Sequence, residues 1–458
     1  MSLSEERAAS IVGTVASAMP AVVTALEDLV RIPGIAFPGF PDSEVDRARD
    51  ATVQILREAG FPTVRVLPIE GGSDAVYAEC PGPVGSPTVL LYAHYDVQPA
   101  GDESLWHSQP FEPTERDGRL YGRGAADDKS GVVIHAGVLK ALLASSPDGV
   151  PPCTVRVIIE GDEEWGGSLE SIVPSHLDLL RADAIVVADV GNLRLGEPTF
   201  TTALRGMAAI TVEVRTLEGA VHSGMFGGPA PDALMALVIT LASLRDAQGD
   251  TVVEGLDGFD WDGPDYPEPL YRDLAGVVEG QPLVGTGTMS SRLFSRPVAS
   301  VVGIDAPRVE GAINAVIPHA RAQVSLRVPP GQDPRVAQAA LMEHLRGHVP
   351  WGVHAEITAG GTGAGVRVAT DGPAYAAARR AMSRAYDGDA VEIGSGGSIP
   401  LIDVLREEFP GVEILLFGAQ DPAARIHAPN ESVDLAELHR AVLAEALFIA
   451  ELATDVNA

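Results

Sequence analysis

Hydrophobic and polar positions follow two different periods along the first two hundred residues. Apolar residues at helical spacing predict helices up to about residue 30 and over residues 42–59, 130–144 and 169–180. Short runs of apolar and β-branched residues between them predict strands at 63–67, 75–79, 88–94, 154–160 and 184–188. Because helices alternate with apolar strands, the pattern predicts an α/β fold whose mostly parallel sheet is covered by helices.

The pattern changes near residue 200. Alternating strands at 208–216, 322–328 and 353–358 accompany two amphipathic helices, at 232–244 and 335–346, which predicts a smaller α+β domain with one covered sheet face. After the glycine cluster at 360–365, a helix predicted over 375–386 and a strand predicted over 412–417 return to the alternation of helices and apolar strands seen in the first two hundred residues. We therefore expect a discontinuous domain of residues 1–202 and 362–458, interrupted by an inserted domain of residues 203–361.

Composition narrows the class of protein. The 458 residues are 46% hydrophobic and carry 32 Lys+Arg against 63 Asp+Glu, a net charge of −31, which argues against nucleic acid and anionic membranes as partners. The N-terminal segment lacks a basic start followed by an apolar core, and no unbroken apolar stretch of about 18 residues occurs, so we expect neither a signal peptide nor a membrane span. Cys80 and Cys153 stand alone, which favours buried thiols in a cytoplasmic protein.

Acidic residues and histidines form separate groups, four of which lie at or just beyond the end of an apolar strand. They occur at five places: His94-Tyr-Asp96, Asp127-Asp128, Glu163-Glu164, Asp189 and His427. The carboxyl ends of parallel strands meet at one edge of a sheet, which is where open α/β sheets bind ligands. A divalent transition metal needs three or four imidazole and carboxylate ligands, so the five places together predict a metal site.

Each motif alone also has a simpler explanation. An isolated His-X-Asp can be a hydrogen-bonded loop entry, and Asp128 can be the N-cap of the helix that follows it. The four acids within residues 160–164 are harder to explain, because so much like charge beside a buried strand is unfavourable without a cation. Adjacent glutamates such as Glu163 and Glu164 can divide two tasks, one binding metal and the other accepting a proton from water.

The ordered motifs HYD, GRGAADDKSG, GDEEWGGS, VVADVG and RIHAPNE resemble metallopeptidase family M20, and most of all its dipeptidase branch, that of carnosinase and the cytosolic nonspecific dipeptidase. The resemblance extends from LEDLVRIP at residues 26–33 to the motif around His427. It implies a zinc-peptidase-like catalytic domain, with the inserted domain acting as a lid and in dimerisation.

The resemblance also implies two zinc ions per subunit, each held by a histidine and a carboxylate, with one aspartate between them. The ligands would be His94 and Asp189 for the first ion, Glu164 and His427 for the second, and Asp127 as the bridge. Mn²⁺ or Co²⁺ could replace zinc in such nitrogen and oxygen sites. Asp96 would orient His94, and Glu163 would act as general base and then as acid. Relatives often have a cis peptide after the bridging aspartate.

The inserted segment carries further likeness. His222, in VHSGMFGGP, resembles a histidine that reaches across a dimer to stabilise the oxyanion, although a lone loop histidine is also commonly solvent-exposed. Asn314 and Arg327 resemble substrate-contacting positions; Arg327 could equally form a surface ion pair. The loop Gly394-Ser-Gly-Gly-Ser398 resembles one that receives the carboxylate end of the substrate, with Ser395, Gly396 and Gly397 as candidates.

Three hypotheses about function follow. The first is a homodimeric dipeptidase that cleaves dipeptides or short peptides with a free C-terminal carboxylate, through a water bridging two zinc ions. The second is an N-acyl-amino-acid deacylase or desuccinylase of the same fold, and the third is a non-catalytic binding protein. Trp165 and Val190 occupy positions that are often small or polar in relatives, which leaves the size of the substrate open.

Overall fold

A computed structural model describes residues 3–397 and 399–456 of the chain. The chain forms two compact units. Unit 1 consists of Met1–Thr202, Val368–Glu392 and Pro400–Ala458, and unit 2 of Ala203–Arg367 and Ile393–Ile399. Both units combine sheets with helices, so the expected α/β class is confirmed.

Six strands form the central sheet of unit 1: β1 Thr63–Leu67, β2 Ala75–Cys80, β3 Thr88–His94, β6 Thr154–Glu160, β7 Ala184–Val187 and β17 Glu413–Leu416. Their order is β1-β2-β6-β3-β7-β17. The strands β6, β3, β7 and β17 run parallel, whereas β2 is antiparallel to both of its neighbours. The parallel strands are buried along almost their whole length, as expected for a sheet covered on both faces.

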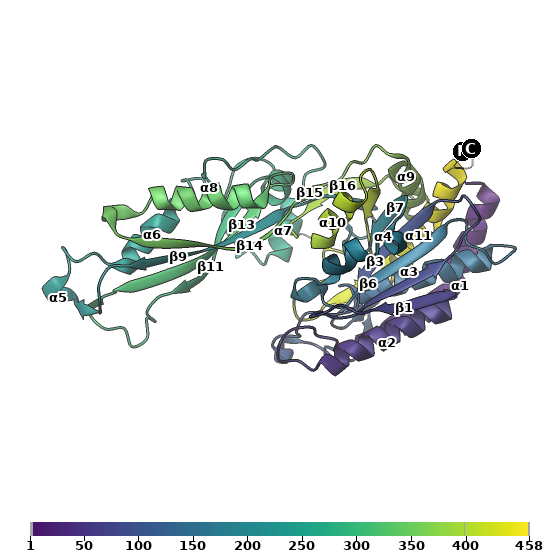
Figure 1. Ribbon diagram of the computed structural model, residues 1–458, viewed down its shortest axis with the longest axis horizontal. Coiled ribbons are helices and arrows are strands. Elements are labelled where there is room, and N and C mark those ends of the chain that lie inside the picture. Colours follow the sequence, from purple (N-terminus) through teal and green to yellow (C-terminus); the bar gives the residue numbers. More distant parts are fainter. Residues whose placement is uncertain (1–2, 398, 457–458) are drawn as a thin grey trace. The chain divides into compact units, whose positions relative to one another are not determined.

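Five long helices pack with this sheet and with one another: α1 Glu5–Val30, α2 Asp42–Ala59, α3 Lys129–Ser145, α9 Pro373–Tyr386 and α11 Leu435–Val456 (Figure 1). The smaller elements are β4 Thr114–Arg116, β5 Arg119–Tyr121, β18 Ser432–Asp434, α4 Leu177–Leu180 and α10 Pro400–Glu408. The helix expected over 169–180 is wrong in part, because residues Leu169–Ser175 form a 3-10 helix and only α4 is α-helical. Pro174 lacks the N–H that a continuous α-helix needs there.

The helix α1 has the length and composition of a membrane-crossing helix, with a mean hydropathy of 1.7 in its most apolar window. Charges and small residues interrupt the apolar stretch, so the sequence contains no unbroken apolar run of spanning length there. Ile11, Val15 and Leu26 are fully buried in the core, where α1 packs against α3. Within the described part of the chain, α1 therefore serves as a core helix of unit 1.

Unit 2 is built on an antiparallel sheet of four strands: β9 Gly206–Arg215, β11 Val298–Asp305, β13 His319–Val328 and β14 Ala355–Gly363. Their order is β11-β13-β9-β14, so β11 lies at an edge. The helices α6 Ala233–Ala242 and α8 Pro334–Gly347 cover one face, on which alternate residues of β9 and β13 are buried. Further elements of unit 2 are β10 Val221–His222, β12 Ala315–Val316, β15 Val366–Arg367, α5 Ser223–Phe226 and α7 Glu268–Leu274, while the strands β8 Thr199–Leu204 and β16 Val391–Ser395 each begin in unit 1 and end in unit 2.

A buried histidine joins two of the helices to the sheet in unit 1. His135 on α3 contacts the Glu445 carboxylate of α11 through Nδ1, at 2.9 Å, and the Tyr92 carbonyl of β3 through Nε2, at 3.0 Å. Both ring nitrogens face acceptors, so the ring is best satisfied when both carry protons. Burial lowers the pKa of His135, but the charge and hydrogen bond of Glu445 outweigh it and leave the pKa raised.

We predict a pH-dependent contribution of His135 to stability. A pKa raised in the folded state stabilises the fold below the ordinary histidine pKa of about 6.5, and this stabilisation is lost as the pH rises through the folded pKa. His135→Gln should lower the free energy of unfolding by about 2 kcal/mol at pH 6, and by less at higher pH. Urea unfolding of both proteins between pH 6 and 9 measures this; a difference independent of pH would contradict the charged state.

Candidate active site

The carboxyl ends of the parallel strands in unit 1 bring four of the five predicted motifs to one edge of the sheet, and Asp127 joins them from the loop before α3. His94 is the last residue of β3, Glu163 and Glu164 follow β6, and Asp189 follows β7. His427 lies in the loop after β17. This convergence follows from the parallel topology, because strands running in one direction end on one side.

Asp127 lies between the two histidines of the cluster. Its Oδ1 is 3.2 Å from Nε2 of His94, and its Oδ2 is 2.9 Å from Nε2 of His427. Each histidine has a second carboxylate beside it: Nε2 of His94 is 3.9 Å from Asp189 Oδ2, and Nε2 of His427 is 3.1 Å from Glu164 Oε2. The arrangement is thus two histidine–carboxylate sets that share one aspartate.

Asp96 supports both halves of this cluster. Its carboxylate accepts the backbone N–H groups of Glu163 and Glu164, both at 3.1 Å, and so fixes the 3-10 turn that carries them. Its Oδ1 also lies 3.3 Å from Nδ1 of His94, opposite the ring nitrogen that faces Asp127. A side chain in this place orients the imidazole without sharing its Nε2.

The two adjacent glutamates have different surroundings. The carboxylate of Glu164 accepts a hydrogen bond from Gln98 Nε2 at 2.7 Å and faces His427. The carboxylate of Glu163 has no hydrogen bond or ion pair with any side chain in the described part of the chain. One glutamate is therefore held as a ligand would be, and the other is available to accept a proton.

Burial of so many acids shifts their pKa values. Burial raises the pKa of Glu163 to about 8; the charge of His94 opposes this shift, and the neighbouring acids Glu164, Asp96 and Asp127 add to it. Hydrogen bonds to Asp127 and Glu164 raise the pKa of His427 to about 10. Burial also raises the pKa of Asp127, but its hydrogen bonds with both histidines hold it well below the ordinary value.

The chemistry of these donors fits divalent cations. Ligand atoms of His94, Asp127 and Glu164 lie within 4.8 Å of one another, as do those of His94, Asp128 and Asp189. No Arg or Lys of the described residues forms an ion pair with any of these carboxylates. Buried carboxylates without a cation are strongly unfavourable, so a bound metal would supply the missing positive charge.

Asp128 has a structural task at this edge. Its side chain accepts the Gly131 N–H at 3.2 Å and so caps the N-terminus of α3, as an N-cap aspartate does. Its other oxygen accepts the backbone N–H of His94 at 3.4 Å. The peptide bond between Asp127 and Asp128 is cis, as the resemblance to family M20 implied.

In unit 2, the predicted substrate residue Arg327 lies beside a second arginine. Arg205 carries a half-buried guanidinium whose pKa is lowered to about 10 by burial and by the charge of Arg327. The backbone N–H of Arg205 donates to Ser395 O at 3.2 Å, and a Cβ at Gly396 would lie 3.1 Å from Arg205 Nη2. The loop of Ser395, Gly396 and Gly397 therefore borders the arginine pair; Ser398 lies outside the described residues.

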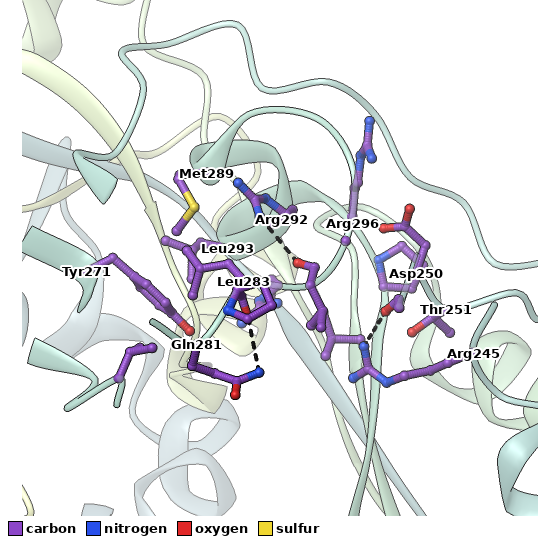
Figure 2. A pocket seen from close by; sticks show the side chains of 18 residues that line it. Arg245, Asp250, Thr251, Tyr271, Gln281, Leu283, Met289, Arg292, Leu293 and Arg296 are labelled. Carbon is purple, nitrogen blue, oxygen red and sulfur yellow. Dashed lines mark hydrogen bonds between the residues drawn. The ribbon is translucent and has the colours of Figure 1, made fainter. Parts of the chain in front are cut away.

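A cavity of about 420 Å³ in unit 2 is lined by Arg205 and by three further arginines, Arg245, Arg292 and Arg296 (Figure 2). These three donate to backbone carbonyl oxygens of Gly249, Val284 and Thr286, at 2.5, 3.2 and 2.7 Å. Nε of Arg205 is buried and has no hydrogen-bond partner in the described part of the chain. Among these four arginines, Arg205 is thus the one whose guanidinium is best placed to receive an anion.

His222 and Asn314 lie elsewhere in unit 2. His222 is the last residue of β10 and pairs with Ala315 of β12. Asn314 directly precedes β12 and its carbonyl accepts the Ser223 N–H at 3.0 Å. The side chains of His222 and Asn314 are both exposed. Arg327 pairs with Met207 at one end of the β9–β13 ladder, and His319 pairs with Arg215 at the other end, next to β12. Eight residues of strand separate these ends, about 27 Å. Figure 1 shows α5, which follows His222, beyond that far end of the sheet.

Three polar residues escaped the sequence analysis. Gln98 holds Glu164, Gln420 donates to Asp189 Oδ1 at 3.0 Å, and Arg205 neighbours Arg327. Gln98 stands four residues after His94, and Gln420 lies shortly after β17. Their closeness in sequence to the strand-end motifs was the one feature that could have predicted a place in the site. Arg205 offered none, because a single arginine before a strand is common.

Comparison with known proteins adds independent information. A sequence model of Peptidase family M20/M25/M40 matches residues 90–451. Cysteinylglycine-S-conjugate dipeptidase of Corynebacterium striatum is 38% identical over 421 residues, which cover 90% of this chain and 91% of that protein. Beta-Ala-His dipeptidase of Rattus norvegicus is 30% identical over 411 residues, covering 86% and 80%. The crystal structure of human carnosine dipeptidase 1 has the same fold, with a TM-score of 0.81 at 23% identity over 98% of this chain and 99% of that one.

Proposed function

The chain belongs to peptidase family M20, and on that premise we propose that it is a metal-dependent dipeptidase that cleaves dipeptides with a free C-terminal carboxylate. The observation that carries the proposal is the symmetric placement of two histidine–carboxylate pairs around Asp127. One cation would be held by His94, Asp189 and Asp127, and another by Glu164, His427 and Asp127. Two bound divalent cations supply Lewis-acid polarisation of the scissile carbonyl and acidify water.

The residues of the chain divide the remaining work. Glu163, whose carboxylate has no side-chain partner in the described residues, takes the proton of the attacking water and passes it to the leaving amine. Asp96 keeps His94 and the turn of Glu163 in place.

The carboxylate of the substrate would bind in unit 2. Arg327 lies close enough to Arg205 for the two positive charges to repel, and neither has a carboxylate partner among the described residues, so an anion bound to both guanidinium groups would offset this repulsion. The bordering loop of Ser395, Gly396 and Gly397 would offer backbone donors. Asn314, which precedes the strand that pairs with His222, would contact the substrate together with His222.

The activity would require a homodimer. His222 cannot reach the arginine pair of its own unit 2, because about 27 Å of sheet separates them. A second copy of the chain would supply it. Exposed apolar side chains on the edge strand β11 and on the outer face of α6 offer a surface for that copy: Val301, Val302, Ile304, Met235 and Val238.

The identity of the metal and the location of the protein are parts of the same proposal. Zinc suits the nitrogen and oxygen donors, and Mn²⁺ or Co²⁺ would suit them as well. Cys80 and Cys153 are free, buried thiols, which is compatible with the cytoplasm. An N-acyl-amino-acid deacylase remains the alternative function, since its substrates carry the same terminal carboxylate.

The first prediction concerns the reaction. The metal-reconstituted protein should hydrolyse Cys-Gly or β-Ala-His, should lose this activity with a chelator and should regain it with Zn²⁺, Mn²⁺ or Co²⁺. Glu163→Gln should retain both metals while kcat falls by about 10²- to 10⁴-fold. Amino-acid release and metal content measure these effects. Faster hydrolysis of N-acetyl or N-succinyl amino acids would instead favour the deacylase.

The second prediction concerns the substrate carboxylate. Arg327→Met and Arg205→Met should each raise KM for a dipeptide by about 10- to 100-fold, the value of a lost charge-assisted hydrogen bond, with a smaller effect on the dipeptide amide. Arg321→Met is the matched control, because Arg321 lies on the same strand, is exposed and pairs with Asp305. Equal effects on the acid and the amide would rule out carboxylate recognition.

The third prediction concerns the second copy. At substrate concentrations well below KM, His222→Ala and Arg327→Ala should each be nearly inactive alone, yet mixed and reassembled chains should recover roughly a quarter of wild-type activity, because half of the dimers would be mixed and each would hold one complete site. Sedimentation should show dimers in all samples. If the mixture stays inactive, His222 does not act across the dimer.

A further inference from the structure

The carboxylate of Glu431 lies at the centre of a network beneath the proposed metal ligands. It is fully buried and accepts four hydrogen bonds. Oε1 accepts the backbone N–H groups of Ala126 and Asp127, at 3.0 and 3.1 Å, and Oε2 accepts the Gly124 N–H at 3.0 Å and Nη1 of Arg123 at 2.6 Å. Four donors satisfy the full acceptor capacity of a carboxylate. The loop that presents Asp127 is therefore wrapped around a single side chain.

Arg123 extends the network to two further loops. Its Nη2 donates to the Pro99 carbonyl, in the loop after β3, and to the Ala428 carbonyl, next to His427, at 3.3 and 3.4 Å. Its guanidinium also lies over the Trp106 ring, 5.4 Å from the centroid. One ion pair thus ties together the loops that follow His94, contain Asp127 and contain His427.

The loop of His427 needs such support. His427, Arg425 and Asn430 all have positive φ angles, of 61°, 56° and 66°, in a region that side chains other than glycine enter only at a cost. Asn430 holds one part of the loop, with its Oδ1 accepting the His107 N–H at 2.7 Å. Glu431, the next residue, holds the other part by binding the loop of Asp127.

From these contacts we infer that Glu431, paired with Arg123, is the positioning residue that sets the spacing between Asp127 and His427. Asp127 would bridge both cations and His427 would bind only one, so this spacing decides the affinity of the His427 site. The inference rests on the proposed metal-dependent function. Arg123 and Glu431 lie 308 residues apart in the sequence, and neither side chain contacts the proposed metal-ligand atoms. The pair would nevertheless set the distance between two of those ligands.

The test is metal affinity rather than activity alone. Glu431→Gln places an amide N–H₂ against the donors Gly124 N–H and Arg123, which should push the loop away. Zn²⁺ titration of the chelator-treated protein, in competition with a chromophoric chelator, should show one of two sites weakened by about 10- to 100-fold. At limiting Zn²⁺ kcat should fall by a similar factor with KM within about threefold, and excess Zn²⁺ should restore much of it.

Two further variants sharpen the test. Arg123→Lys, whose single ammonium group cannot serve Glu431 and two carbonyls together, should weaken the same site by a smaller factor. Glu451→Gln is the matched control: Glu451 is fully buried and pairs with Arg380 at 3.0 Å and with Leu3 N at 3.1 Å, away from the ligand loops. It should lower thermal stability and leave both Zn²⁺ affinities unchanged.

The outcomes separate this inference from the proposed function. A wild-type chain that binds none of Zn²⁺, Mn²⁺ and Co²⁺ would contradict the proposed function itself. A wild-type chain that binds two ions, together with a folded Glu431→Gln variant of equal affinities, would overturn only the role of Glu431. Loss of folded protein in both Glu431→Gln and Arg123→Lys, with no folded form of weakened affinity, would overturn it as well, because the pair would then be purely structural.

Discussion

Burial of many carboxylates at one edge of a parallel sheet is the constraint on which the rest of the structure depends. Asp96, Asp127, Glu163, Glu164 and Asp189 all gather there, and each would be unfavourable alone in a poorly solvated place. Two histidines and several backbone N–H groups partly offset this cost, and bound cations would offset the rest. The carboxylates are not stabilised equally: Glu164 is held by Gln98 and His427, whereas Glu163 has no such side-chain partner in the described residues.

Support for the site comes from charged residues that make no contact with the predicted ligand atoms. Asp96 binds the turn of the glutamates, and Glu431 binds the loop of Asp127. Each works through backbone N–H groups, so it fixes the path of the chain as well as one side chain. This explains why buried acids accumulate around the site beyond the number that could bind metal.

Unit 2 contributes positively charged side chains, in contrast to the carboxylates of unit 1. In a chain with a net charge of −31, two neighbouring arginines without carboxylate partners among the described residues support the proposed site for the substrate carboxylate. The length of the β9–β13 ladder keeps these arginines and His222 apart within one chain. If His222 takes part in catalysis as proposed, it must therefore come from a second copy of the chain.

The sequence by itself determined the α/β class, most of the long elements and the identity of the clustered acids and histidines, because hydrophobic period and strand-end position are local properties of the chain. It did not predict the break at Pro174 or the edge strand β11, where local signals were mixed. Only the tertiary structure decided which oxygen of Asp127 faces which histidine, that Arg205 adjoins Arg327, and that Arg123 meets Glu431. Such pairings join residues up to hundreds of positions apart, and they follow from how strands and loops pack rather than from any nearby pattern.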